Sequence, residues 1–194
     1  MSERALAFPK GYDHKQQRTV ALFAAQLDDQ LGLLKEAISG LTVAQFEWQP
    51  HKGMNTIGML LAHLAIVEVF WINLAAEEVQ MQPDGEKIMK EKIGITSDDD
   101  GMPLAPEGKH PEILKGKTHD DYVKMLDGAR VTVHSALQGW NDTDLDKTFK
   151  RREWSISRMW TLYHVLEHFA CHFGQILVLK HMMRDAGILT KEKE

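Results

Sequence analysis

The chain has 194 residues, 43% of them hydrophobic and 26% charged, and a formal net charge of −5. This length can bury the core of one domain, which we place over residues 1–194, and the composition excludes a disordered chain or a coiled-coil array. The negative balance offers no broad basic surface, so nucleic acid and anionic membranes are not expected partners.

The N-terminal residues, MSERALAFPKGYDHK, lack the apolar stretch of a signal peptide. No run of the chain reaches the roughly 18 apolar residues that a transmembrane helix needs. Cys171 is the single cysteine, which excludes an intrachain disulfide framework and fits a reducing compartment. We therefore expect a cytoplasmic protein.

The first half of the chain predicts two long helices, at about 13–39 and 55–79. Apolar residues recur at three- and four-residue steps from Val20 to Ile38, and Gly40 fits a C-terminal stop. Asn55 or Thr56 can cap the second helix. Its apolar face is so broad that we expect the helix to be largely buried.

Residues 80–117 break this pattern with interleaved glycines and prolines and the acidic run Asp98-Asp99-Asp100. We expect a long irregular loop between the second and third helices. A connection of this length is often functional, for instance as a lid or a pocket wall, and the alternative is a solvated insertion.

The second half predicts helices at about 118–138 and 157–186. Thr118 and Asp121 resemble a capping box, Gly139 ends the third helix, and Gly187 lies just beyond the fourth. No convincing strand pair is expected. Four long amphipathic helices joined by uneven connectors predict an all-α four-helix bundle, a fold whose interior commonly holds metal sites.

The fourth helix contains HVLEHFACH, with His164, His168 and His172 four residues apart. Residues four apart on a helix share a face, so either neighbouring pair can bind one metal ion. The outer two drift apart by roughly 80°, so one pair should dominate. A catalytic zinc site usually has three protein ligands, and His63 in the second helix is the best third candidate, its alternative being a hydrogen-bonded core histidine.

A competing interpretation takes the letters H-V-L-E-H as the inverted zincin motif, with His164 and His168 as ligands and Glu167 as base. That class also needs a carboxylate ligand well downstream. Only 26 residues follow His168, and Glu192 and Glu194 in the polar tail are poor candidates. We therefore place this interpretation second.

Other side chains near these motifs have simpler interpretations. Glu68 lies roughly 140° from the face of His63 and should not share its ion, and an amphipathic helix usually leaves a glutamate such as Glu68 or Glu167 in solvent. Cys171 is a capable ligand type, but we expect it to be a small buried hydrophobe. A buried position is also the expectation for four tryptophans, Trp71, Trp140, Trp154 and Trp160.

The chain resembles the DinB/YfiT-like family of bacterial four-helix proteins. The resemblance rests on NTIGMLLAHLAIVEVFWI at 55–72 and WTLYHVLEHFACHFGQILVLKHMM at 160–183. Both motif helices occur in the family's order and spacing, and the third helix is compatible. The first helix adds only its pattern.

The resemblance implies a ligand set. In the family, a histidine of the second helix joins two residues four apart on the last helix, just before a Gly-Gln pair. By position these are His63, His168 and His172, which precedes Gly174 and Gln175. Many members read His-His-Arg-Gly-Gln where this chain has Cys-His-Phe-Gly-Gln at 171–175, so the ligand histidine is kept and the arginine is lost.

The resemblance also implies a function. The metal would be zinc or nickel, and relatives include bacillithiol- and mycothiol-dependent S-transferases, an isomerase and some hydrolases. We expect the metal to activate a low-molecular-weight thiol or water for attack on a small-molecule substrate, with His164 and Glu167 in supporting roles. The alternative is a non-catalytic metal-binding stress-response protein. A homodimer is a further implication.

Overall fold

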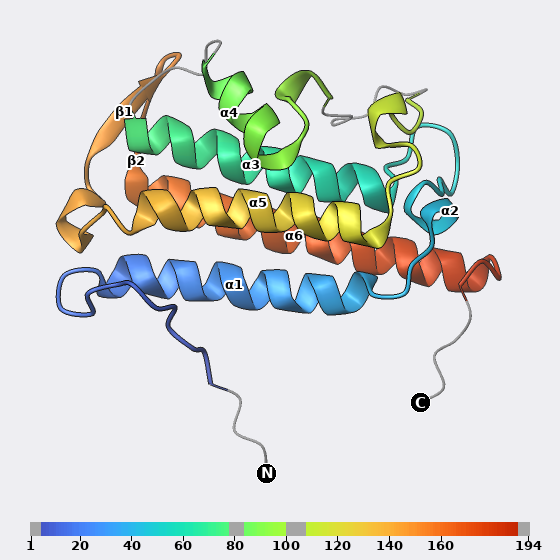
Figure 1. The fold of residues 1–194 in the computed structure, drawn as a ribbon, viewed down its shortest axis with the longest axis horizontal. Helices are drawn as coiled ribbons and strands as arrows, with labels where there is room; N and C mark the ends of the chain where they lie inside the picture. The colour runs from blue at the N-terminus through green and yellow to red at the C-terminus, as the bar shows by residue number, and fades with distance from the viewer. Residues whose placement is uncertain (1–4, 78–83, 100–107, 190–194) are drawn as a thin grey trace.

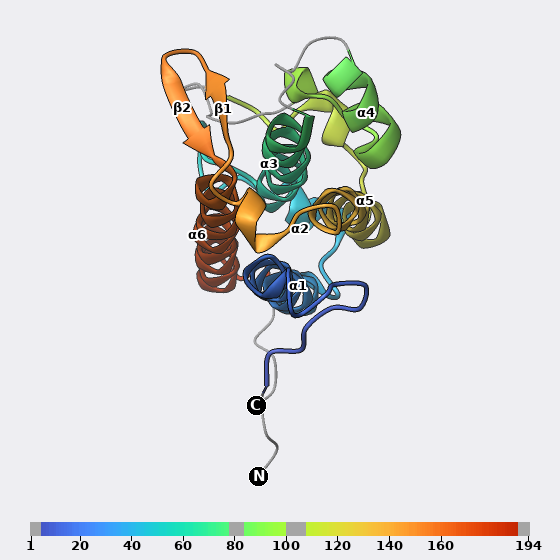
Figure 2. The same cartoon turned by 90° about the vertical axis from the view of Figure 1, so that its left-hand side faces the viewer.

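The computed structural model describes residues 5–77, 84–99 and 108–189. Four long helices lie along the longest axis of the molecule, namely α1 (Arg18–Ile38), α3 (Ile57–Glu77), α5 (His119–Leu137) and α6 (Arg158–Asp185) (Figure 1). Viewed from the end, they occupy the four corners of a bundle (Figure 2). The all-α bundle expected from the sequence is confirmed.

Three of the long helices begin at a hydroxyl side chain. Thr56, Thr118 and Ser157 each accept a hydrogen bond from the backbone N–H three positions further on, which satisfies one of the free donors of the first turn. Asp121 completes the capping box at Thr118. These starts agree with the predicted bounds to within about two residues, the usual uncertainty of a helix end.

Helix α1 begins at Arg18, not near residue 13 as predicted. No side chain of its own N-cap residue closes its first turn. Instead the Asp142 carboxylate accepts hydrogen bonds from the backbone N–H groups of Thr19 and Val20 at 2.9 and 3.1 Å. This cap comes from the short helix η3 (Asp142–Asp144), a partner that local sequence spacing does not indicate.

The segment 80–117 is not an irregular loop throughout. It contains α4 (Asp84–Ile93) and the short helices η1 (Ser97–Asp99) and η2 (Glu112–Leu114), while α2 (Val43–Phe46) lies in the earlier connector. Residues 78–83 and 100–107, including the end predicted for the second helix, lie outside the described residues. Helix α4 packs on α3 and α5. Four apolar side chains of the described part of this segment are buried, Met89, Ile93, Ile95 and Leu114. The described part therefore packs on the bundle and is not a solvated insertion.

The expectation of no strand pair was wrong. Strands β1 (Thr148–Arg151) and β2 (Trp154–Ser157) form an antiparallel hairpin in which Arg151 pairs with Trp154. Arg152 in the turn has a φ of 54°, a conformation usually given to Gly, Asn or Asp in tight hairpin turns. The hairpin rises beside the end of the bundle where α3 ends and α6 begins (Figure 2).

Helix α3 is the core helix. Its residues Ile57–Ala76 have a mean hydropathy of 1.9, long and apolar enough to cross a membrane by composition alone, but 78% of that stretch is buried inside the protein. It packs mainly against α5 and α6. Burial against other helices accounts for its apolar character.

Glu68 of α3 is not in solvent as predicted, because only 2% of it is exposed. Its carboxylate accepts hydrogen bonds from Arg130 of α5 at 2.7 and 3.3 Å. Arg130 also donates to Asp28 of α1, which contacts His134 at 3.0 Å. A buried carboxylate needs such a partner, and sequence periodicity could not show that Arg130 lies opposite.

Candidate metal centre

Three histidines converge between α3 and α6. His63 projects from the middle of α3, and His168 and His172 lie one turn apart on the facing side of α6. The Nε2 atom of His168 lies 3.0 Å from that of His63 and 3.1 Å from that of His172. The structure thus brings together the three residues proposed as ligands, although His63 lies 105 positions before His168 in the sequence.

The geometry of this cluster fits a metal ion. One nitrogen of each ring lies within 4.8 Å of the other two. Two zinc–nitrogen bonds of about 2.1 Å at a tetrahedral angle place their nitrogens about 3.4 Å apart, close to the separations observed. Within residues 5–77, 84–99 and 108–189, no fourth His, Cys, Asp or Glu joins the group. A three-residue set leaves a coordination position for a small molecule.

The surroundings of His168 disfavour its protonated form, which leaves a ring lone pair available. Burial lowers the pKa of His168 to about 3, and the neighbouring His172, His63 and His164 lower it in the same direction. The Nδ1–H of His172 donates to the Gln175 side-chain oxygen at 2.8 Å. A proton on Nδ1 leaves the lone pair on Nε2, the tautomer that a metal ligand requires.

Gln175 is therefore placed to orient the His172 ring. In the sequence it served only as part of the Gly-Gln pair that follows the ligand positions. Outer hydrogen-bond partners of this kind orient histidine ligands and raise their basicity. The spacing His172-x-x-Gln175, one helical turn, was the available signal.

His164 lies beside the cluster, not in it. Its ring is 5.8 Å from that of His168 between centroids, and its Nδ1 contacts Glu167 Oε1 at 3.2 Å. The ring stacks on Trp160 at 4.6 Å with an interplanar angle of 14°. His164 and Glu167 thus form a pair next to His168. The inverted zincin set of His164 and His168 lacks the close approach of ring nitrogens seen for the other three.

Two further expectations about side chains were wrong. Cys171 is exposed and not a buried hydrophobe. Trp154 and Trp160 are 66% and 41% exposed, whereas Trp71 and Trp140 are buried as expected. Trp154 lies on the hairpin and Trp160 in the first turn of α6, and both line the same open pocket.

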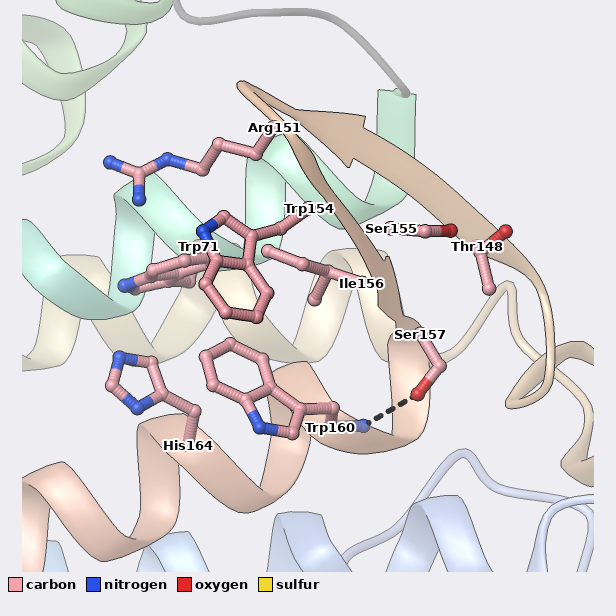
Figure 3. Close-up of a pocket in the computed structure, with 9 residues that line it drawn as sticks. All are labelled: Trp71, Thr148, Arg151, Trp154, Ser155, Ile156, Ser157, Trp160 and His164. Carbon is pink, nitrogen blue, oxygen red and sulfur yellow. Dashed lines mark hydrogen bonds between the residues drawn. The ribbon is translucent and has the colours of Figure 1, made fainter.

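An open pocket of about 620 Å³ adjoins the cluster at His164. Its walls include Trp71 of α3, Trp160 of α6, and Arg151, Trp154 and Ile156 of the hairpin. Figure 3 shows the three indole rings and the His164 ring gathered on one side of the hairpin, with Arg151 reaching over them. No residue of 84–99 or 108–117 lines this pocket, so the described part of the long connection is not its wall.

Sequence reasoning missed Arg151 and the hairpin that carries it. The alternation of apolar and polar residues on both sides of Arg152-Glu153 could have indicated a strand pair. The turn itself lacks the Asn-Gly or Asp-Gly pair that usually marks a hairpin. Trp160 and Trp71 could have been found by helical spacing, since they lie four residues before His164 and eight after His63.

The fold and the cluster together define a four-helix bundle with three histidines converging between two of its helices. The chain belongs to the DinB superfamily, which it matches over residues 26–176. This confirms the resemblance seen in the two motif helices.

A solved structure of low sequence identity shows the same fold. A conserved protein from Enterococcus faecalis superposes with a TM-score of 0.65 at 16% identity, covering 84% of this chain and 96% of that one. A DinB-like protein from Bacillus cereus is 17% identical, with a TM-score of 0.48 and coverage of 88% and 96%. No curated protein matches this chain.

Proposed function

We propose that this protein is a divalent-metal-dependent enzyme that activates a low-molecular-weight thiol, or water, at His63, His168 and His172. The observation that carries the proposal is the convergence of three imidazole nitrogens with no carboxylate among them in the described residues. Imidazole nitrogen suits zinc and nickel. A bound ion supplies positive charge that lowers the pKa of a thiol or water beside it.

The neighbouring side chains supply the proton transfer. The thiol proton passes to His164, whose imidazole is oriented by Glu167. The thiolate sulfur then forms a bond to an electrophilic carbon of the substrate while the bond from that carbon to its leaving group breaks. His164 returns the proton to the departing group, so the reaction transfers sulfur without any oxidant or reductant.

Two alternative functions would use the same three histidines. With water in place of the thiol, the same residues would make a metal-dependent hydrolase. A non-catalytic metal-binding protein of the stress response would use the ion to hold α3 against α6. Structural zinc sites are usually closed by four protein ligands, so the three-residue set favours an enzyme.

Metal content tests the ligand set directly. We expect the purified protein, loaded with zinc or nickel and desalted, to hold about one ion per chain by elemental analysis. His63→Ala, His168→Ala and His172→Ala should each lose it, while His164→Ala, the matched control on α6, should retain it. Retention by His172→Ala together with loss by His164→Ala would instead indicate the zincin set.

A thiol-transfer assay then distinguishes an enzyme from a non-catalytic metal-binding protein. The loaded protein should accelerate conjugation of a small thiol to 1-chloro-2,4-dinitrobenzene, and His172→Ala should not. His164→Gln should keep the metal and lower the rate, most strongly at low pH, where fewer thiols ionise unaided. A loaded protein that accelerates neither this reaction nor ester hydrolysis would support the non-catalytic alternative.

A further inference from the structure

The pocket beside the histidine cluster has aromatic walls that face solvent. The exposed indoles of Trp154 and Trp160 stand near the buried indole of Trp71, whose ring lies 5.5 Å from that of Trp160. Large aromatic surfaces gathered in one concave place, unlike single exposed residues, usually mark a binding site. Indole faces favour flat rings, because offset stacking adds to the burial of apolar surface.

The pocket also contains a cation, the guanidinium of Arg151, that no carboxylate of the described residues pairs with. The Arg151 guanidinium lies 4.7 Å from the centroid of the Trp71 ring and 5.1 Å from that of Phe70. In the part of the chain that the structure describes, no carboxylate pairs with it. Burial, and then the neighbouring Arg152, lower the pKa of Arg151, so its surroundings disfavour the charge that an arginine nevertheless keeps.

Contacts with aromatic rings orient this guanidinium without using its hydrogen-bonding edge. Its Cζ lies over the Trp71 ring, a cation–π contact that depends on the positive charge and not on the N–H groups of the planar fork. A planar fork matches a carboxylate in a bidentate manner. The pocket therefore combines stacking surfaces with a preorganised site for an oxyanion.

The position of the pocket relates it to the chemistry. His164 belongs to its wall and is the ring next to His168. A ligand stacked against Trp160 therefore ends close to the histidine cluster. The volume of about 620 Å³ suits a molecule of moderate size.

We propose that this pocket binds the electrophilic co-substrate of the reaction, and that the co-substrate has a flat apolar ring and a carboxylate. The ring stacks on Trp154 and Trp160, and Arg151 binds the carboxylate. The inference rests on the proposed function for the reaction, but its ligand chemistry stands on the pocket alone.

Calorimetric titration with three probes tests the ligand chemistry in metal-free and zinc-loaded protein. The probes are 2-naphthoate, the neutral 2-naphthamide, and cyclohexanecarboxylate, which has the charge but no aromatic face. We expect 2-naphthoate to bind about tenfold more tightly than the amide. Loss of the aromatic face should weaken binding by about threefold or more.

Matched variants identify the residues. Arg151→Met should abolish the preference for naphthoate over naphthamide, whereas Arg152→Met, with the same change of charge one residue on, should preserve it. Trp154→Leu should weaken both naphthyl probes, and Tyr163→Leu, which removes an exposed aromatic outside the pocket, should not. The comparison of probes on the unaltered protein stands even where a variant fails to fold.

Three outcomes would overturn the proposal. The first is equal binding of naphthoate and naphthamide, or no binding of either. The second is naphthoate binding that needs zinc and is unaffected by Arg151→Met, because the carboxylate would then be a metal ligand. The third is a Trp154→Leu variant with altered sedimentation and unaltered probe affinity, because the hairpin face would then be an interface between copies.

The His172→Ala variant separates this inference from the proposed function. We expect it to lose the metal and to bind 2-naphthoate within about twofold of the unaltered protein, since His172 does not line the pocket. If the unaltered protein took up neither zinc nor nickel on loading but still showed Arg151-dependent binding, the pocket's ligand chemistry would be supported and the metal-dependent reaction refuted. Metal-dependent turnover without Arg151-dependent binding would support the proposed function and refute the ligand chemistry of the pocket.

Discussion

Glu68 and His63 are two polar side chains of helix α3 whose surroundings differ. Glu68 faces α5 and is closed by Arg130, with Asp28 and His134 beyond it. His63, five residues earlier, faces α6 and meets two more histidines. The first cluster is compensated by opposite charges from within the protein. The second brings together three imidazole nitrogens, the donor type that a divalent metal ion prefers.

This difference distinguishes a structural cluster from the one that we propose binds a metal ion. A buried ion pair satisfies both of its charges within the protein, and breaking it is costly. Three converging imidazole nitrogens are instead a ligand set that a divalent cation can use. On one helix, the paired carboxylate thus indicates architecture, and the converging histidines suggest a binding site.

The cluster of Glu68, Arg130, Asp28 and His134 is called the closed cluster below, and the three converging histidines the open cluster. Breaking the closed cluster should have the largest effect on stability. Glu68→Ala leaves Arg130 buried beside a single half-exposed carboxylate, Asp28, and should lower the free energy of unfolding by about 3–5 kcal/mol. Denaturant unfolding measures the loss. Glu167→Gln, which removes a more exposed carboxylate, should cost under about 1 kcal/mol. If Glu68→Ala cost no more than this control, the ion pair would have no structural role.

Filling the open cluster should stabilise the protein. With zinc at about a hundred times its dissociation constant, the free energy of unfolding should rise by about 2.7 kcal/mol. His168→Ala should abolish this gain, and His164→Ala should keep it. A gain that survives in His168→Ala would place the ion elsewhere.

Loosening one ligand should have a smaller effect. Gln175→Leu removes the acceptor of the His172 Nδ1–H bond and should weaken zinc binding by up to about tenfold, or about 1.4 kcal/mol. A competition titration with a chromophoric chelator measures the change. Because Gln175 is exposed, stability without metal should stay the same. Unchanged zinc affinity would show that the tautomer is set without Gln175.

The two clusters should lose stability in different ranges of acidic pH, and near neutral pH the free energy of unfolding should change least. In metal-free protein, unfolded His168 takes up a proton below about 6.5, but the folded residue does so only near its pKa of about 3. Stability should therefore fall as the pH drops through this interval. Unfolding curves at several pH values should show a shallower loss in His168→Gln, and an identical slope would contradict the assignment.

The closed cluster responds in a more acidic range. Burial alone would raise the pKa of Asp28, but hydrogen bonds from His134 and Arg130 lower it. Its contribution to stability is therefore present above the unfolded pKa of about 3.9 and is lost as the pH falls through the lower folded value. Asp28→Asn should remove this loss and leave the slope assigned to His168 unchanged.

The sequence by itself determined the four long helices, the bundle and the family, because these depend on local properties. Apolar spacing defines a helix face, hydroxyl residues such as Thr118 and Ser157 define helix starts, and a four-residue spacing places His168 and His172 on one side. His63 was the best third candidate as a histidine of the second helix, and the resemblance then assigned it to the site, since helical spacing cannot say which helices face one another.

Only the tertiary structure decided which partners long-range packing brings to each side chain. Glu68 looked solvated until Arg130 was found opposite, and α1 begins late because Asp142, from far along the chain, caps it. The hairpin and its Arg151 depend on cross-strand pairing around a turn without a glycine. Local propensity encodes helices, whereas a buried charge, a remote cap and a pocket exist only once distant segments meet.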